Sequence, residues 1–379
     1  MGLHDLVSKA LWGICGLMPI DRRKILFSSY YGRGYSDSPK AIAETLLKTG
    51  ADVKLCWLVK SEAEAATLPD GITPIDQNNA MMRIMAYSTS RVWVDNCRKY
   101  VPHKRKGQYY LQTWHGFALK MIEADATQAL EEEYIRGSRN DSAMTDVIVS
   151  GSGFMSGLYR NSFWYDGAIA ELGTPRNDIF FGDACAALSR KVRSVLNLPE
   201  SRRLVLYAPT FRADQNLECY ALDARRLLSA CETRFGGDWT VLIRLHPNIA
   251  AKSVGLFPYD GEQIVDATGY PDMQELLAGA DLLLTDYSSS MFDYALTGKP
   301  CVQFALDVES YTRERNFYFP LTDLPFPMAR SNEDLEETIL RYDQAQWSGR
   351  WTRFMEDNGF REDGCASGRC ADWILEHLG

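Results

Sequence analysis

The chain alternates between short apolar runs and longer segments in which apolar residues recur at helical spacing. The short runs are typical of buried strands, and the periodic segments are typical of amphipathic helices. In the first part of the chain, the predicted strands are Lys24–Ser28, Val53–Val59, Arg91–Asp95, Tyr109–Thr113, Asp146–Ser150 and Ala168–Leu172, and the predicted helices are Pro39–Leu47 and Asn78–Tyr87. This alternation predicts a mostly parallel sheet with helices on its faces.

A second series of the same kind begins near Ser189. Its predicted strands are Leu204–Tyr207, Trp239–Leu245, Gln263–Val265, Asp281–Thr285 and Cys301–Phe304, and its helices are Asp223–Cys231, Asp272–Leu277 and Ser290–Leu296. Two such series predict an α/β protein of two Rossmann-like domains facing a cleft, where ligands commonly bind. We place the domains at residues 24–183 and 184–345. A helical segment, residues 346–379, is predicted to cross back over the first domain.

Residues 1–23 have a pattern of their own. Apolar side chains fall on one face of a predicted amphipathic helix at Leu3, Leu6, Val7, Ala10, Leu11, Ile14, Leu17 and Met18. Pro19 ends the helix, and Arg22, Arg23 and Lys24 follow it. Such a helix either lies in a membrane interface or packs on the domain that follows, and the pattern favours neither.

Composition and charge narrow the class of protein. The 379 residues are 46% hydrophobic and 24% charged, as in soluble globular proteins. No apolar run reaches the roughly 18 residues of a spanning helix. The net charge of −9 argues against general nucleic-acid binding. The nine cysteines form no C-x-x-C pair, which favours reduced thiols in the cytoplasm over disulfides or a zinc site.

The most informative stretch is Thr285–Pro300, TDYSSSMFDYALTGKP. A buried strand is predicted to end at its first residues, and a helix to start among Ser288, Ser289 and Ser290. The free N–H groups of a helix start suit a phosphate, and ligands of open α/β sheets bind at the carboxyl ends of strands. Asp293 follows about one turn into the helix, where it can reach a sugar or glycerol hydroxyl. The alternative is an ordinary capped turn.

Two histidines also follow predicted strands. His115 lies in QTWHGFALK, in which Gly116 allows close approach of a ligand and Lys120 adds a positive charge. His246 lies in RLHP, two residues after Arg244 and on the same side of the strand end. A histidine beside a second cation at a strand end is a candidate general base or phosphate ligand. The alternative for each is a hydrogen-bonded structural histidine.

Two further turns carry candidate phosphate ligands. Arg176 lies in GTPRND, and Pro209 and Thr210 lie in YAPTFR after the first strand of the second series. Together these turns gather cations and hydroxyl groups that suit a diphosphate. Neither a P-loop nor a dinucleotide fingerprint is present, and there is no D-x-D pair. The sequence therefore does not require a metal or another cofactor, because cations and helix ends can meet the charge of a leaving group.

Taken in order, the segments QTWHG, GTPRND, YAPTFR, RLHP and TDYSS, with NFYF at 316–319 and DGCASGR at 363–369, resemble the CDP-glycerol glycerophosphotransferase family of teichoic acid synthesis. The resemblance runs from about residue 24 to 375 and implies a GT-B fold on the cytoplasmic face of the membrane. It implies CDP-glycerol as donor, with contacts from His115, Gly116, Lys120, Arg176, Pro209, Thr210, Arg244, His246, Ser288, Ser289 and Asp293.

The implied reaction transfers glycerol phosphate to a hydroxyl group of a lipid-linked saccharide or polyol-phosphate acceptor and releases CMP, without a metal. Either His115 or His246 serves as the base. The chain departs from the family pattern at Phe117-Ala118, Phe211 and Cys370. We expect these differences to affect the preference for donor or acceptor more than the type of reaction. The alternatives are a GT-B glycosyltransferase using a CMP- or UDP-sugar, a transferase of CDP-ribitol or another CDP-polyol, and an inactive membrane scaffold. The acceptor and the oligomeric state stay open.

A basic run, RKYVPHKRK at residues 98–106, precedes the strand that leads to His115. It holds cations and no acidic residue. We expect it either to face anionic lipid or to form a solvated loop.

Overall fold

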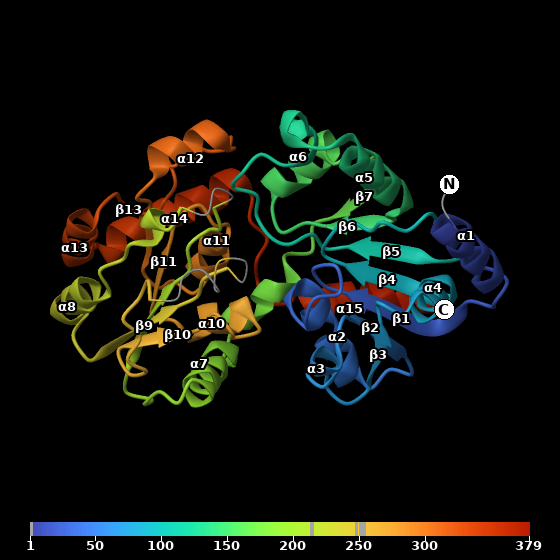
Figure 1. The fold of residues 1–379 in the computed structure, drawn as a ribbon, viewed down its shortest axis with the longest axis horizontal. Coiled ribbons are helices and arrows are strands. Elements are labelled where there is room, and N and C mark those ends of the chain that lie inside the picture. The colour runs from blue at the N-terminus through green and yellow to red at the C-terminus, as the bar shows by residue number, and fades with distance from the viewer. Residues whose placement is uncertain (1–2, 213–215, 247–248, 250–254) are drawn as a thin grey trace. The chain divides into compact units, whose positions relative to one another are not determined.

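The computed structural model describes residues 3–212, 216–246, 249 and 255–379, and it divides into two compact units (Figure 1). The first unit comprises Met1–His115, Ile122–Asp178 and Phe360–Gly379, and the second comprises Gly116–Met121 and Ile179–Gly359. Every strand pair in both sheets is parallel. The predicted α/β fold with two Rossmann-like halves is therefore confirmed.

The first unit is built on a seven-stranded sheet with the order β3-β2-β1-β4-β5-β6-β7. Its strands are β1 (Asp21–Ser28), β2 (Lys54–Val59), β3 (Ile72–Asp76), β4 (Ser90–Asp95), β5 (Tyr109–Gln112), β6 (Val147–Val149) and β7 (Ala168–Ala170). Its helices are α1 (Leu3–Cys15), α2 (Asp37–Thr49), α3 (Glu62–Ala65), α4 (Ala80–Thr89), η1 (Glu123–Ala129), α5 (Glu132–Met144), α6 (Gly153–Ser162) and α15 (Ala366–Leu378), and η2 (Pro175–Phe180) spans the boundary with the second unit.

Alternation along the strands divides the core of the first unit into two layers. Phe27 and Trp57 face one side, where Ile42 of α2 and Ile374 of α15 join them. Leu26 faces the other side, in a cluster that contains Cys56, Leu58, Ala86, Tyr87, Trp93, Tyr110 and Met144. Because successive side chains of a strand point to opposite faces, each strand supplies both layers. The strands are buried on both sides, which explains their continuous apolar runs.

The second unit is built on a six-stranded sheet with the order β10-β9-β8-β11-β12-β13. Its strands are β8 (Arg203–Tyr207), β9 (Trp239–Ile243), β10 (Ile264–Asp266), β11 (Leu282–Thr285), β12 (Cys301–Phe304) and β13 (Met328–Ala329). Its helices are α7 (Ala184–Val195), η3 (Glu218–Tyr220), α8 (Ala224–Phe235), α10 (Met273–Gly279), α11 (Ser290–Ala295), α12 (Val308–Glu314), α13 (Asn332–Leu340) and α14 (Gln344–Asn358). The sequence did not predict β13, because two residues carry too little periodicity.

Residues 116–121, which lie within the predicted first domain at 24–183, group with the second unit. Phe117 packs its ring against Phe292, Phe319 and Phe354, with centroids 4.6, 5.8 and 5.9 Å apart. The backbone of this segment also pairs with the NFYF segment, because Lys120 and Phe317 form an antiparallel bridge. The ring at position 117, a departure from the family pattern, thus anchors this segment in the second unit.

The C-terminal helices belong to different units. Helix α14 lies in the second unit, and the chain then returns to the first unit, where α15 packs on α2. Asp178 prepares the start of α15, because its carboxylate accepts hydrogen bonds from the backbone N–H groups of Ala366 and Ser367 at 3.0 and 2.7 Å. The DGCASGR segment therefore has a structural role at this helix start.

Helix α1 and the turn after it pack on the first unit with one side and expose apolar side chains on another. Trp12 contacts the rings of Tyr87 and His103, and Cys15 is buried. Ile14 and Leu17, by contrast, are 62% and 87% exposed. The buried side supports a helix packed on the domain, and the exposed apolar side chains support a helix in a membrane interface. Among the helices that the structure describes, none combines the length and the apolar character that crossing a membrane requires.

The basic run contains two cations that are not available to lipid. Arg98 is buried and pairs with Glu123 and Asp141, and Lys99 is buried and pairs with Asp95. The expectation that the whole run either faces lipid or is solvated is therefore wrong for Arg98 and Lys99. A buried cation is stable only beside opposite charge. Glu123 and Asp141 lie 25 and 43 residues from Arg98, so the local sequence pattern does not reveal them as its partners.

We predict that Ile374→Ala destabilises the first unit by about 2–5 kcal/mol, because it removes a fully buried side chain between α15 and the sheet. Calorimetric unfolding of the full chain measures the effect. Glu376→Ala, an exposed position on the same helix, serves as the control and should change stability by less than about 0.5 kcal/mol. Equal effects of the two variants would contradict the packing of α15 in this core.

Candidate functional site

The predicted site residues follow the carboxyl ends of parallel strands in both units. His115 follows β5, Arg176 follows β7, Pro209 and Thr210 follow β8, Arg244 and His246 follow β9, and Ser288 and Ser289 follow β11. The strand order reverses direction at the β1/β4 pair in the first sheet and at the β8/β11 pair in the second. Ligands of open α/β sheets bind beside such switch points. His115 and Arg176 belong to the first unit, and the other residues belong to the second.

The His115 imidazole is fixed on three sides within the first unit. Its Nδ1 lies 2.8 Å from the carbonyl oxygen of Asn96, which follows β4. Its ring stacks on Trp114 with centroids 4.1 Å apart, and Tyr30 lies 6.2 Å away on the centroid measure. A carbonyl oxygen only accepts hydrogen bonds, so Nδ1 carries the proton and Nε2 keeps its lone pair. This is the tautomer that a general base acting through Nε2 requires.

Burial lowers the pKa of His115 below its ordinary value, although the hydrogen bond to Asn96 and the charge of Asp37 oppose this shift. The imidazole is therefore neutral at pH 7, with its lone pair available. A structural histidine also forms one hydrogen bond. What distinguishes His115 is its half-buried position at a strand end with Nε2 not engaged by any residue that the structure describes.

Arg176 is held within the first unit by a buried carboxylate. Its guanidinium lies 2.7 Å from Asp37, at the start of α2, and Asp37 also accepts a hydrogen bond from the Tyr30 hydroxyl at 2.6 Å. Burial raises the pKa of Asp37, but the charge of Arg176 and the hydrogen bonds outweigh burial and lower it. Arg176 is thus linked to His115 through Asp37 and the ring of Tyr30.

In the second unit, Arg212 joins two strand ends. It donates to Asp286 at 2.8 Å and to Asp307 at 2.6 Å, and Tyr287 donates its hydroxyl to Asp307 at 3.0 Å. Asp286 follows β11, and Asp307 follows β12. Arg212 is almost fully buried, and its charge is met by two carboxylates. It therefore holds the two turns in place.

Asp286 also fixes the backbone at the switch point. Its carboxylate accepts hydrogen bonds from the N–H of Thr210 at 2.8 Å and from the N–H of Tyr287 at 2.6 Å. Pro209, which precedes Thr210, is buried. The Thr210 hydroxyl is itself buried and has no hydrogen-bond partner among the described residues. A hydroxyl left in this state at a strand end is a candidate ligand contact.

Lys120 lies at the end of the segment that Gly116 begins with a φ of 107°. Its ammonium group is 5.2 Å from the centroid of Tyr311, which stacks on Tyr287 at 4.0 Å. Burial lowers the pKa of Lys120 to about 8; the Asp286 carboxylate opposes this shift, and Arg212 adds to it. A cation with this pKa is charged at pH 7 and binds an anion readily, because an anionic partner relieves its desolvation.

Arg244 and His246 leave the sheet together. The Arg244 N–H donates to the Tyr207 carbonyl at 2.9 Å, which extends the pairing of β8 and β9 by one residue. Arg244 is half-buried, and His246 is exposed with its ring 5.2 Å from that of Phe211. Phe211, another departure from the family pattern, is therefore the ring beside this histidine. Pro247 of the same motif lies outside the described residues.

The serine-rich turn begins α11 as predicted. The hydroxyl oxygens of Ser288 and Ser290 lie 2.9 Å apart, and the Ser290 N–H donates to Ser288 at 3.3 Å. Ser288 and Ser289 are half-buried. Asp293 is buried inside the unit, and the Gln274 amide of α10 lies 3.4 Å from its carboxylate. The serines are therefore more accessible to a ligand than Asp293 is.

Sequence reasoning missed the groups that organise both sites. In the first unit these are Tyr30, Asp37 and Asn96, and in the second they are Arg212, Asp286 and Asp307. Asp286 had a local signal, because it stands between a strand end and three serines. The others act through contacts between distant segments. Within the described ranges, no group of three or more His, Cys, Asp or Glu side chains is placed to hold a metal ion.

The chain is similar to known proteins over most of its length. The sequence model of the CDP-glycerol:poly(glycerophosphate) glycerophosphotransferase family matches residues 14–376. The teichoic acid poly(glycerol phosphate) polymerase of Bacillus subtilis (strain 168) is 30% identical over 342 residues, which cover 87% of this chain and 45% of the polymerase. The chain therefore spans about half the length of that relative.

Two other matches cover most of both compared chains. The teichoic acid glycerol-phosphate transferase of Staphylococcus aureus (strain NCTC 8325 / PS 47) is 28% identical, over 94% of each chain. A solved structure of a variant of the wall teichoic acid polymerase TagF, soaked with CDPG, has a TM-score of 0.85 at 28% identity and covers 98% of this chain and 93% of that chain. The GT-B-like fold is therefore shared with TagF.

We predict that Lys120 loses its proton near pH 8. In protein whose lysines carry ¹³C-methyl groups, an NMR titration should show one dimethyl-lysine signal moving around this pH, because burial disfavours the charged form. The Lys120→Arg variant assigns that signal by removing it. A Lys120 signal that stays unchanged up to pH 10 would contradict the buried position of this ammonium group.

Proposed function

Because the chain belongs to the CDP-glycerol:poly(glycerophosphate) glycerophosphotransferase family, we propose that it transfers glycerol phosphate from CDP-glycerol to a hydroxyl group of a lipid-linked acceptor and releases CMP. The reaction contributes to teichoic acid or a related cell-surface polymer. The observation that carries the proposal is the state of His115, whose Nδ1 is bound to Asn96 and whose Nε2 keeps its lone pair. Such a base is what transfer to a hydroxyl group needs.

In the proposed reaction, Nε2 of His115 takes the proton from the acceptor hydroxyl as its oxygen attacks the phosphorus that carries glycerol. A new P–O bond forms to the acceptor, and the P–O bond to CMP breaks. The departing phosphate oxygen keeps the electron pair of the broken bond. His115 ends the step as an imidazolium and returns its proton to solvent. In phosphoryl transfer, positioning and charge stabilisation are the main contributions of the protein.

The second unit is proposed to bind the donor. Lys120, Arg244 and His246 supply positive or hydrogen-bonding groups for the diphosphate, and the Thr210 hydroxyl has hydrogen-bonding capacity to spare. Ser288 and Ser289 present hydroxyl and N–H groups at the start of α11. Gly116 leaves space for the donor, Pro209 shapes the turn, and Asp293 supports it from inside. Arg176 acts through Asp37 on the side of the base.

We propose that the reaction needs neither a metal ion nor another cofactor. Lys120, Arg244 and His246 suffice to meet the charge on the leaving CMP, together with the N–H groups of the serine turn. His246 stabilises the leaving group in this scheme, and His115 is the base. Their different environments support the assignment, because His115 is held in one tautomer and His246 is exposed.

The acceptor is proposed to be presented at the cytoplasmic face of the cell membrane, to which the protein binds peripherally. Support comes from α1 and the turn after it, where the exposed Ile14 and Leu17 suit a membrane interface. The acceptor is a saccharide or polyol phosphate linked to lipid. Nucleic acid is not a proposed partner, in view of the net charge of −9.

We predict that purified protein releases CMP from CDP-glycerol when a lipid-linked acceptor analogue is added. His115→Ala should lower the rate by about 10²–10⁴-fold, as expected for loss of a general base. His246→Ala should lose most of the rate as well. His103→Ala, at an exposed histidine that contacts Trp12, is the matched control and should keep the rate. The rate should also survive EDTA, and a loss restored by a divalent ion would contradict the metal-free proposal.

The same assay separates the alternatives. Release of CMP from CDP-ribitol in place of CDP-glycerol would change the donor and keep the reaction type. Consumption of a CMP- or UDP-sugar without turnover of CDP-glycerol would identify a glycosyltransferase. A folded protein that turns over none of these donors with any acceptor, yet pellets with vesicles, would be an inactive scaffold.

We also predict that the double variant Ile14→Gln/Leu17→Gln pellets less with vesicles of anionic phospholipid, by about tenfold or more in partition coefficient, since burying each large apolar side chain contributes about 1.5–3 kcal/mol. Val195→Gln, at a residue of the second unit that is 56% exposed, is the control and should pellet normally. Both variants should release CMP at the normal rate with a detergent-soluble acceptor. Normal pelleting of the double variant would remove Ile14 and Leu17 from the membrane contact.

A further inference from the structure

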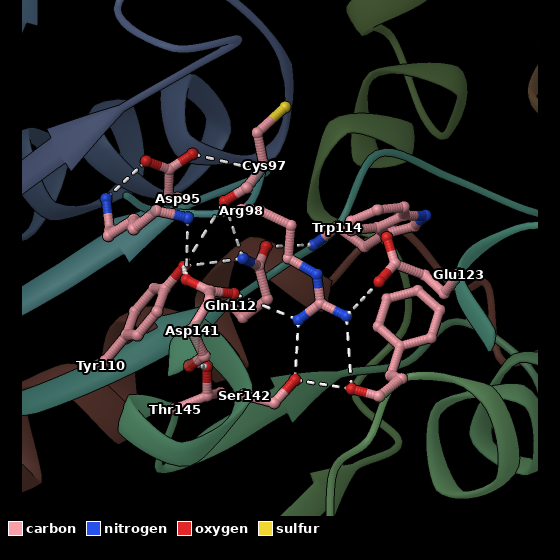
Figure 2. Close-up of polar contacts among 12 residues, drawn as sticks. Asp95, Cys97, Arg98, Tyr110, Gln112, Trp114, Glu123, Asp141, Ser142 and Thr145 are labelled. Atoms are coloured by element: carbon pink, nitrogen blue, oxygen red, sulfur yellow. Dashed lines mark hydrogen bonds and ion pairs between the residues drawn. The ribbon is translucent and has the colours of Figure 1, made fainter. Parts of the chain in front are cut away.

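A buried polar network lies next to His115 in the first unit, with Arg98 at its centre (Figure 2). The Arg98 guanidinium donates to Asp141 at 3.1 Å, to the Ser142 hydroxyl at 2.9 Å and to Glu123 at 2.8 Å. It also donates to the carbonyl of Phe163 at 3.3 Å. Arg98 is 2% exposed, so a substrate cannot reach it and its effect on a reaction must pass through other residues.

The network reaches the end of β5 through Gln112. The Gln112 amide nitrogen donates to the Cys97 carbonyl at 2.9 Å and to the Tyr110 hydroxyl at 2.7 Å, and that hydroxyl donates to Asp141 at 3.1 Å. The Gln112 amide oxygen accepts from the N–H of Trp114 at 2.9 Å. Figure 2 shows the Gln112 amide beside the Arg98 side chain, with its hydrogen bond to the Trp114 backbone. Gln112 is completely buried, and both ends of its amide are satisfied.

Trp114 has an unfavourable backbone conformation, with a φ of 51°. A bulky residue rarely adopts the left-handed region, and such conformations persist where surrounding contacts impose them. Here the contacts are identifiable. Gln112 holds the Trp114 N–H, the Arg98 guanidinium lies 5.7 Å from the Trp114 ring centroid, and Phe163 meets that ring edge-on at 4.7 Å.

Two contacts hold His115. Its ring stacks on the Trp114 ring with centroids 4.1 Å apart, and its Nδ1 is bound to the Asn96 carbonyl. Asn96 and Arg98 belong to the same turn after β4, two residues apart. The network therefore contacts the ring beneath the imidazole directly, and it holds the turn that presents the Asn96 carbonyl, through Arg98 and the Cys97 carbonyl. A small displacement of either support changes the direction of the Nε2 lone pair.

We propose that Arg98 and Gln112 are positioning residues, which hold Trp114 in its left-handed conformation and thereby fix the orientation and tautomer of His115. The inference rests on the proposed role of His115 as the base. A network that only stabilised the fold would change the population of folded protein and leave the chemistry of the folded molecules intact. If Arg98 and Gln112 position His115, their substitution instead lowers the turnover rate of the molecules that remain folded.

The test compares Arg98→Lys with Arg193→Lys in full-length protein. Lys keeps the buried charge but cannot reach all four partners of Arg98. Arg193 is a matched control, since it is a buried arginine of the second unit that pairs with Asp281 at 3.0 Å. We expect Arg98→Lys to lower kcat by about 10²-fold with KM for CDP-glycerol unchanged, because a 1 Å misplacement costs that much. Arg193→Lys should keep kcat, even though it should lose as much thermal stability as Arg98→Lys or more.

Gln112→Met is the second variant, since it keeps the apolar length of the side chain and removes the acceptor of the Trp114 N–H. It should show the same loss of kcat, in case Arg98→Lys does not fold. A normal kcat in folded Arg98→Lys or Gln112→Met would overturn the proposal. An equal loss of kcat in Arg193→Lys would also overturn it, because the effect would then follow stability alone.

A measurement that needs no activity separates this inference from the proposed function. The chain has five histidines, so ¹⁵N NMR of histidine-labelled protein, with His115→Ala to assign the signal, reports the tautomer of His115. We expect the Nδ1-protonated form in the wild type and a mixture of tautomers in Arg98→Lys and Gln112→Met. The same tautomer in all three proteins would overturn the positioning role. A tautomer change in a protein that never turns over CDP-glycerol would support positioning and reject the proposed function.

Discussion

A cation removed from water must be met by opposite charge, and this requirement shapes both units. Arg98 is met by Glu123 and Asp141, Lys99 by Asp95, and Arg176 by Asp37. In the second unit, Arg212 is met by Asp286 and Asp307. Apart from Lys99 and Asp95, which are four residues apart, each pair joins segments that are distant in sequence. The carboxylates of Asp95, Asp286 and Asp307 lie at or just after strand ends. Buried charge thus fixes the turns on which the proposed site is built, beyond what apolar packing alone specifies.

The two units use this device for different purposes. In the first unit, charge pairs surround one neutral imidazole and leave its Nε2 lone pair available. In the second unit, the buried pairs hold the turns, while Lys120, Arg244 and His246 remain partly or fully accessible. A general base needs an unprotonated nitrogen, and a diphosphate needs positive charge, so the two environments suit the two proposed substrates. The positions of the buried carboxylates therefore decide which unit keeps a neutral imidazole and which keeps accessible cations.

The sequence predicted the architecture because its signals are local. Runs such as those around Leu26 and Phe27 identify strands buried on both faces, and the turn at Ser288–Ser290 identifies a helix start. The organising contacts were not predictable in this way. Arg98 stands in a run of cations that looks exposed, and its partners Glu123 and Asp141 lie 25 and 43 residues away. Only the fold brings such groups together. The same reason explains why the pairing of Arg176 with Asp37, 139 residues away, was not predicted.

The assignment of residues 116–121 to the second unit has a consequence for protein engineering. The peptide bond between His115 and Gly116 separates the two units, so the proposed base and Lys120 belong to different units although they are only five positions apart. A chimera designed to exchange the donor-binding half with that of a relative must therefore carry two segments, 116–121 and 179–359. Exchanging residues 179–359 alone would leave Phe117 without the partners with which it packs, Phe292, Phe319 and Phe354. Exchange of the second unit of this chain is therefore a two-segment graft.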